Sequence, residues 1–327
     1  MTKYLKPLFL FIGLLFLIVL INKVGVERIF EQILAVKEAF LWCIIIAGGW
    51  HILYAISWSI SLGGSNYKIT LKELFQIRLA GEAMNGLTPF IGLGGEPLKI
   101  HLLGKLVRLD ACIGSVMIEK TMFITSGIVV MTLGTLLSMI YLNLDPFTKL
   151  FLATATMAGI TILGAAFTHR GARIFTVLTD GIRKLRFHPG WLDRSQNFLA
   201  KLDTYIVTFY TDRPAAFASS ALCHFAARFL GVIEMWIILY ALGADLTLLQ
   251  IVYIWSLTNF FSQVFSFIPS SIGALEGSQA FLLMTLGQDP MLGLVLGIIR
   301  RTRQLCFLSL GLVFLAMWGG IKPVQST

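Results

Sequence analysis

The chain has 327 residues, of which 57% are hydrophobic and 13% charged, and its mean hydropathy is +0.81. A soluble domain carries charge on about a quarter of its residues, so this composition excludes a water-soluble globular protein. The net charge of +9 does not indicate nucleic acid as a partner, because most Lys and Arg residues flank apolar stretches and set membrane orientation there.

The first half of the chain contains three apolar spans and one interrupted segment. Spans are predicted at 7–21, 40–62 and 111–142. The first follows two lysines and has no Ala-x-Ala-like site after it, so we interpret it as an uncleaved span rather than a signal peptide. Between the second and third spans, a helical pattern stops at Pro89 and resumes at Glu96, which predicts two half-helices forming a re-entrant hairpin.

The second half repeats this order. Spans are predicted at 147–168, 214–243 and 291–321, and a second interrupted segment, 250–287, breaks between Pro269 and Gly273. The polar loop 169–213 holds eight Lys and Arg residues against four Asp, which places it in the cytoplasm by the positive-inside rule. With this loop inside, both termini are cytoplasmic, and the chain is expected to be a multi-pass protein of the cell inner membrane.

The resulting fold class is an all-α polytopic membrane protein with six transmembrane helices plus two re-entrant helical hairpins. The two hairpins enter from opposite faces, so 1–142 and 143–327 form an inverted repeat, with the cytoplasmic basic loop in the second unit. Inverted repeats with interrupted helices are typical of secondary transporters, whose substrate sites lie at the interruptions.

The two breaks share a spacing that predicts a site. In each, a Glu follows the Pro by seven residues, and a cation follows the Glu by 24 residues, namely Lys120 in the first half and Arg300 in the second. A cation at mid-membrane costs about 2.5–3.5 kcal/mol and needs a partner. The predicted substrate-binding residues are therefore polar groups near the breaks: Lys120, Arg300, Arg301, Arg303 and Asn85.

The acidic residues near the breaks have two readings. Glu96, Glu276 and Glu119 are predicted to supply countercharge or proton coupling, whereas a Glu in a first helical turn also simply caps that helix. The arginines have an alternative too: Arg300–Arg303 is a cytoplasmic flank if 304–320 alone is the final span. Residues predicted to set backbone geometry at the breaks are Pro89, Gly94, Gly95, Pro269 and Gly273.

Motifs for catalysis and for cofactors are missing from the sequence. It contains no His-Glu-x-x-His, no phosphate-binding P-loop and no Gly-x-Ser-x-Gly. The four cysteines are isolated in apolar segments, without metal-ligand spacing. We therefore expect no metal, no cofactor and no enzymatic activity.

A family resemblance rests on three motifs. Residues 82–89 (EAMNGLTP) with 94–96 (GGE) resemble the first signature of the lysylphosphatidylglycerol synthase transmembrane-region superfamily of flippase-like proteins, and residues 267–277 (FIPSSIGALEG) resemble its second. Residues 300–304 (RRTRQ) are similar to its final span. Ser270 and Ser271 depart from the glycine-rich run common after this Pro. Because the sequence shows no soluble aminoacyl-transferase domain like that of the fused members, the resemblance leads us to expect a stand-alone member, some of which are associated with hopanoid synthesis.

This resemblance implies lipid translocation between leaflets. Together with the cations at the breaks, it leads us to expect flipping of a phospholipid or other lipid-linked anionic headgroup through a polar cavity between the hairpins. The alternatives are an integral-membrane enzyme that modifies a lipid headgroup and a scaffold for a lipid-synthesis complex. Membrane lipids are the expected partners, and the sequence is also compatible with a homo-oligomer.

Overall fold

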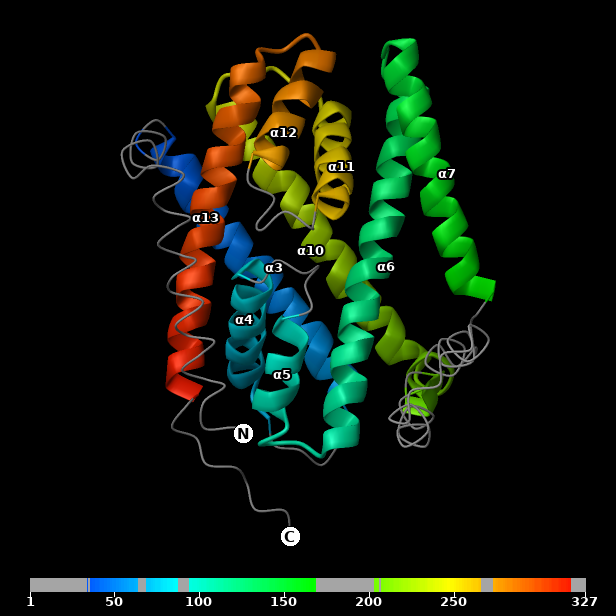
Figure 1. Ribbon diagram of the computed structural model, residues 1–327, viewed down its shortest axis with the longest axis vertical. Coiled ribbons are helices and arrows are strands. Elements are labelled where there is room, and N and C mark those ends of the chain that lie inside the picture. The colour runs from blue at the N-terminus through cyan, green and yellow to red at the C-terminus, as the bar shows by residue number, and fades with distance from the viewer. Residues whose placement is uncertain are drawn as a thin grey trace, which may run out of the picture.

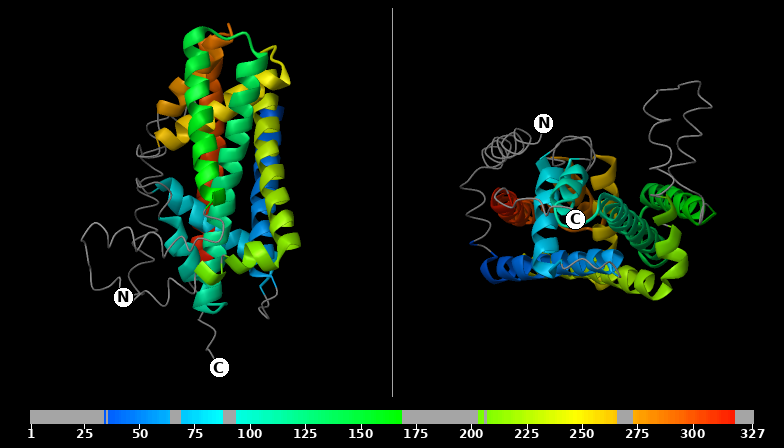
Figure 2. Two further views of the ribbon diagram at one scale, coloured as in Figure 1. Left: turned by 90° about the vertical axis from the view of Figure 1, so that its right-hand side faces the viewer. Right: turned by 90° about the horizontal axis from the view of Figure 1, so that it is seen from below.

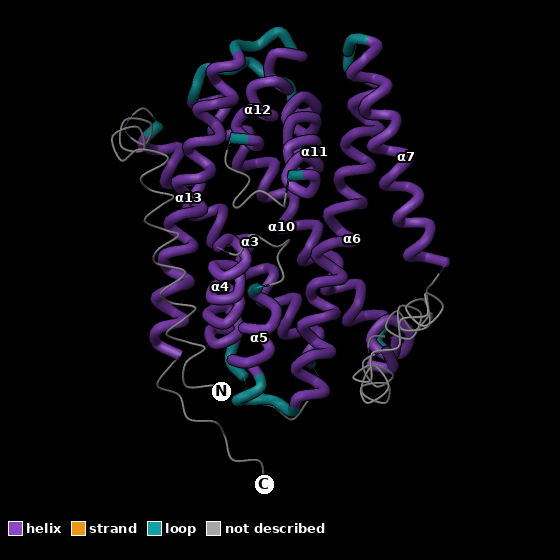
Figure 3. Tube along the Cα trace, in the orientation of Figure 1, coloured by secondary structure: helices purple, strands orange, loops and turns teal. Residues whose placement is uncertain are grey.

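The computed structural model describes residues 34, 36–63, 69–87, 94–168, 203–205, 207–265 and 273–318. The helices in these ranges confirm the all-α prediction for this part of the chain (Figure 3). They are α3 (Lys37–Leu62), α4 (Leu71–Leu87), α5 (Gly95–Leu103), α6 (Leu109–Tyr141), α7 (Pro146–Thr168), α10 (Pro214–Ala241), α11 (Leu248–Val264), α12 (Ala274–Thr285) and α13 (Pro290–Met317).

The same order of long and short helices occurs twice. A long helix, two short helices and a long helix follow one another as α3–α4–α5–α6 and again as α10–α11–α12–α13. The short pair α4–α5 lies at the lower end of the molecule and α11–α12 at the upper end (Figure 1), while the long helices run along its length (Figure 2). The two short pairs therefore occupy opposite ends of the bundle.

Helices from the two halves pack against each other in matched combinations. The first long helices of the halves, α3 and α10, lie along one another. The short helix α4 packs on α13, and its counterpart α11 packs on α6, so each half supports the short pair of the other. Neither half buries its apolar faces alone.

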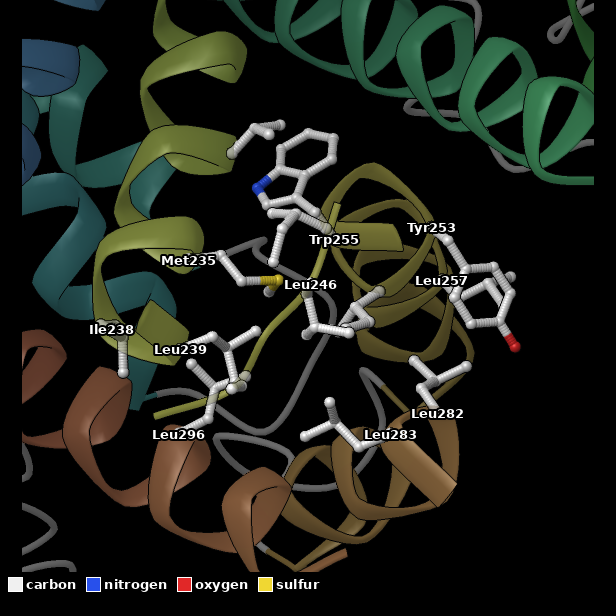
Figure 4. Close-up of a cluster of buried hydrophobic side chains, with 14 of the residues drawn as sticks. Met235, Ile238, Leu239, Leu246, Tyr253, Trp255, Leu257, Leu282, Leu283 and Leu296 are labelled. Atoms are coloured by element: carbon white, nitrogen blue, oxygen red, sulfur yellow. The ribbon is translucent and has the colours of Figure 1, made fainter. Parts of the chain in front are cut away.

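The largest apolar core lies where α10, α11, α12 and α13 meet. Figure 4 shows the side chains of Met235 and Leu239 on α10 turned toward Leu283 on α12 and Leu296 on α13. All four are fully buried. A second cluster packs α4 and α5 against α6 and α13, around Trp58 and Met84. These cores pack the short helices against the long ones.

Several helices in the described part of the chain begin at caps that the sequence encodes. Thr247 and Gln250 form reciprocal bonds at the start of α11, and Asp289 accepts the Met291 N–H ahead of Pro290 at the start of α13. In the turn before α7, the Thr148 hydroxyl and N–H donate to the Asp145 carboxylate, which lowers the pKa of Asp145 because the bonds favour the charged form. The turns between long helices are thus defined locally.

Three described helices, α3, α6 and α10, are long and apolar enough to cross a membrane. Helix α13 has 28 residues but carries three arginines in its middle. The predicted span 7–21 lies outside the described residues, and so does most of the predicted loop 169–213.

Candidate functional site

Charged side chains gather beside the first break in a group that we call the first charge cluster. It comprises three cations and three carboxylates from α4, α5 and α6: Arg78, Glu82, Glu96, Lys99, Glu119 and Lys120. Equal numbers of opposite charges balance the cluster, which lowers the cost of holding ions in an apolar bundle.

Glu119 contacts cations on both short helices of this cluster. One of its oxygens accepts a hydrogen bond from Arg78, and the other lies 3.7 Å from the Lys99 ammonium. The side chains of Arg78, Lys99 and Glu119 are 2%, 1% and 3% exposed. Because Glu119 lies on α6 while its partners lie on α4 and α5, it ties the short pair to the long helix.

Asn85 and Gly95 close the first break from its two sides. The Asn85 side-chain oxygen accepts the Gly95 N–H at 2.7 Å, which joins the end of α4 to the start of α5. A Cβ on Gly95 would overlap the Gly81 carbonyl oxygen and the Asn85 side chain, so only glycine permits this approach. Gly94 is the residue that precedes α5, and Pro89 lies outside the described residues.

Replacing Asn85 by Ala is expected to lower the free energy of unfolding by about 1–3 kcal/mol. The variant leaves the Gly95 N–H without this acceptor and removes the Asn85 contact to Glu96, which is 3.4 Å. Thermal unfolding in detergent compares it with Asn143→Ala, a substitution in the exposed turn between α6 and α7. An Asn85→Ala variant as stable as the wild type would show that this bond does not hold the break together.

Glu96 forms an ion pair with Lys120, the cation that follows it by 24 residues. Its carboxylate lies 3.0 Å from the Lys120 ammonium, between the first turn of α5 and the middle of α6. Its second oxygen is buried and makes no hydrogen bond within the described residues. Glu96 therefore has a cationic partner on α6.

The second charge cluster surrounds the middle of α13. It comprises Glu234 on α10, Glu276 on α12, and Arg300, Arg301 and Arg303 on α13. Glu234 is completely buried, accepts a hydrogen bond from Arg303 and lies 3.9 Å from the Nε of Arg300. The helix continues through the arginines in both directions, so they lie in its middle and not at an end.

Glu276 both caps its helix and forms an ion pair with an arginine. One carboxylate oxygen accepts the Gly273 N–H at 2.8 Å and caps α12, and the other accepts from Arg301 Nε at 2.6 Å. Gly273 has a φ of 81°, a left-handed conformation that favours glycine. The spacing had matched Lys120 with Arg300, but the residue paired with Glu276 is Arg301, one position later on α13. Pro269 lies outside the described residues.

A polar cavity of about 90 Å³ lies within the second charge cluster. The three arginines line it together with Glu276, Gln279, Gln304 and polar residues near the end of α11. Since one water needs roughly 10–15 Å³, the cavity has room for several. The buried Gln279 Oε1 and Glu234 Oε2 make no hydrogen bonds within the described residues. Buried polar atoms of this kind normally bind water or a ligand.

The two clusters differ in charge. The second has three arginines against two glutamates within the described part of the chain, whereas the first is balanced. The predicted substrate-binding residues accordingly fall in two places: Lys120 and Asn85 lie at the first break, and the arginines lie at the second. The excess of positive charge among the described residues is therefore at the second charge cluster.

Aromatic residues of α3 contact both clusters. The Trp50 ring lies 4.6 Å from the Arg303 guanidinium, and the Tyr54 ring lies 4.4 Å from that of Arg78. Stacking on an aromatic face stabilises a cation that has left water. The sequence analysis had not included Arg78, Lys99 or Glu234 in the site. The signal that identifies them is an ionisable residue within an apolar stretch.

The fold and these clusters define a helical membrane protein with paired charges buried at two helix breaks. A model of the lysylphosphatidylglycerol synthase TM region matches residues 7–311, and the chain belongs to this family. Among the described residues, no group of three or more His, Cys, Asp or Glu side chains is placed to hold a metal ion.

Two archaeal relatives are similar along most of their length. A UPF0104 membrane protein of Methanothermobacter thermautotrophicus is 21% identical over 262 residues, covering 76% of each chain. The UPF0104 membrane protein PH1989 of Pyrococcus horikoshii is 20% identical over 313 residues, covering 90% of this chain and 92% of its own. No solved structure matches the sequence.

Proposed function

We propose that this protein moves a lipid with an anionic headgroup between the leaflets of the membrane, and that the headgroup passes through the polar cavity of the second charge cluster. The observation that carries this proposal is the surplus cation beside that cavity, in the middle of a long apolar helix. Membership of the lysylphosphatidylglycerol synthase TM-region family supports a role in handling lipid headgroups.

The energetics favour an anion there. Each arginine at this depth is costly unless it is paired, and Arg301 and Arg303 each have a glutamate at hydrogen-bond distance. Arg300 has the longest of these ion pairs, and its side chain is 20% exposed, the most of the three. A guanidinium suits two-point contact with a phosphate, so Arg300 would bind a headgroup that enters the cavity.

An inverted repeat is part of the proposal. The matched helix order and the reciprocal packing of α4 on α13 and α11 on α6 support units 1–142 and 143–327, with both short pairs as re-entrant hairpins. Two ion pairs agree with this division: Glu96 with Lys120, and Glu276 with Arg301. The proposal has six spans when 7–21 is counted as the counterpart of α7. The protein is expected to lie in the inner membrane, with both termini in the cytoplasm.

Arg300→Gln is expected to slow leaflet exchange about tenfold or more in vesicles that contain the purified protein. The variant removes a charge-assisted contact worth about 1.5–3 kcal/mol, while Arg301 and Arg303 keep their ion pairs. The measurement is the dithionite accessibility of a headgroup-labelled anionic phospholipid. Arg108→Gln is the matched control, because that side chain is 76% exposed and lies outside both clusters.

Three results would contradict the proposal. Equal exchange rates in wild type and Arg300→Gln would remove the arginine from the route. A chemically changed lipid on chromatography, without leaflet exchange, would favour an integral-membrane enzyme instead. Absence of both activities, together with stable co-purified proteins, would favour a scaffold.

A further inference from the structure

An apolar groove lies beside α7, on the far side of α12 from the polar cavity. Its volume is about 440 Å³, within the range of roughly 300–1,000 Å³ that is common for ligand sites. Its walls come from α7, α11 and α12 and consist mainly of aromatic and aliphatic side chains: Phe147, Phe151, Tyr253, Leu257, Phe261 and Phe281.

The groove runs along α11. Tyr253, Leu257, Phe261 and Phe265 recur at every fourth residue and line it from near the start of that helix to its end at the break. At a rise of about 1.5 Å per residue, this face measures roughly 18 Å. Half of a hydrocarbon core about 30 Å thick is about 15 Å, so the groove has the length of one lipid chain.

The start of α12 separates the groove from the polar cavity. Gly273, Ala274 and Gly277 line the groove, whereas Glu276 and Gln279 on the same helix line the cavity. An amphipathic molecule with a polar end and an apolar tail would therefore find both environments on either side of one helical turn.

We infer that the groove binds one acyl chain of the lipid whose headgroup occupies the polar cavity. This inference rests on the proposed function and adds a second binding region, formed by α7, α11 and α12. The occupant is a lipid chain because α7 also presents large apolar side chains to its surroundings, with Phe147 73% and Leu150 64% exposed. In a membrane protein, such side chains face hydrocarbon, and α7 lies at the edge of the bundle (Figure 1).

Gly277 offers a way to fill the groove without disturbing the helices. A Cβ at this position would meet no atom within 4 Å, and the residue is an ordinary helical one. A larger side chain would extend into the groove, and replacing a helical glycine does not weaken the helix. Gly164 on α7 also meets nothing within 4 Å and lies outside the groove, so it is the matched control.

The test uses wild type and Gly277→Ala, Gly277→Leu and Gly277→Phe in phosphatidylcholine vesicles. These vesicles contain phosphatidylglycerol with a photoactivatable diazirine near the end of one acyl chain. Labelled peptides are identified by mass spectrometry. We expect labelling of the groove-lining segments of α7, α11 and α12 in wild type, and a progressive loss with side-chain size that reaches about tenfold in Gly277→Phe. Gly164→Phe is expected to label like wild type.

Leaflet exchange measured on the same vesicles separates the two proposals. Groove labelling that is lost in Gly277→Phe supports the acyl-chain site even if wild type exchanges no lipid, a result that would overturn the proposed function alone. Labelling spread evenly over the helices, or unchanged across the series, would overturn the acyl-chain site. A wild-type dimer that excludes the label from the groove, and that Gly277→Phe dissociates, would also overturn it and would assign the groove to a second copy.

Discussion

Replacing Glu119 by Gln is expected to lower the free energy of unfolding by about 3–5 kcal/mol, the largest electrostatic effect predicted for this protein. The side chain is neutral in the variant, while Arg78 and Lys99 stay buried with one carboxylate fewer. Charges that have lost a partner inside a low-dielectric bundle recover neither hydration nor Coulomb energy. The measurement is the unfolding midpoint in a mixed detergent and denaturant series, followed by tryptophan fluorescence.

A double substitution separates charge imbalance from lost packing. Arg78→Met together with Glu119→Leu removes one cation and one carboxylate, and is expected to be closer in stability to wild type than Glu119→Gln, because apolar pairs replace buried ion pairs at little cost. Asp110→Asn is the exposed control. Its partner Arg108 is 76% exposed, and a change below about 1 kcal/mol is expected. If Glu119→Gln shows an effect as small as Asp110→Asn, the first charge cluster does not stabilise the fold.

Gly293→Leu is expected to separate α12 from α13 and to cost at least about 1–3 kcal/mol of stability. A Cβ at Gly293 would overlap backbone atoms of Ala280 and Gln279, which cannot move without displacing α12. Because Glu276 and Gln279 lie on α12, the Arg301–Glu276 ion pair and the polar cavity are expected to be disturbed as well. We expect both the thermal unfolding midpoint and the rate of leaflet exchange to be lower than in wild type.

Gly277→Leu is the control for Gly293→Leu. It shows whether the loss of stability comes from the close contact between α12 and α13 or from the size of the new side chain alone. The two substitutions add the same side chain, but the position of Gly277 is open where that of Gly293 is closed. We expect Gly277→Leu to unfold within about 1 kcal/mol of wild type. Equal losses of stability in the two variants would mean that α12 and α13 are not packed as closely as the structure has them.

Local pattern was enough to locate the helices. Apolar length, together with Pro and Gly at the breaks, predicted ranges that agree within a few residues with α3, α6, α7 and α10. Capping of a helix by a Glu in its first turn was also predictable, because it depends on residues three apart on one helix, here Gly273 and Glu276. Predictions at 1–33, 88–93 and 266–272 fall on residues that the structure does not describe.

Which carboxylate pairs with which cation could not be predicted from the sequence in the same way. The sequence spacing placed Lys120 24 residues after Glu96 and Arg300 24 residues after Glu276, but it fixed no partners. The contacts join Glu96 to Lys120 and Glu276 to Arg301. Neighbouring residues on a helix point about 100° apart, so one position decides which side chain faces α12 and which faces α10. Glu234 was not predicted as a site residue, because its link to Arg300 and Arg303 depends on the packing of α10 against α13.

The sequence by itself determined that this is an all-α membrane protein with two interrupted helices and costly charges near the interruptions, because hydropathy, helix breakers and charge are local properties of the chain. Only the tertiary structure decided which charges neutralise one another, that the surplus cation lies at the second cluster, and that an apolar groove lies behind α12. These features depend on helices distant in sequence coming side by side. The charge balance of the clusters and the space of the groove arise from that packing, and no single segment of the sequence encodes them.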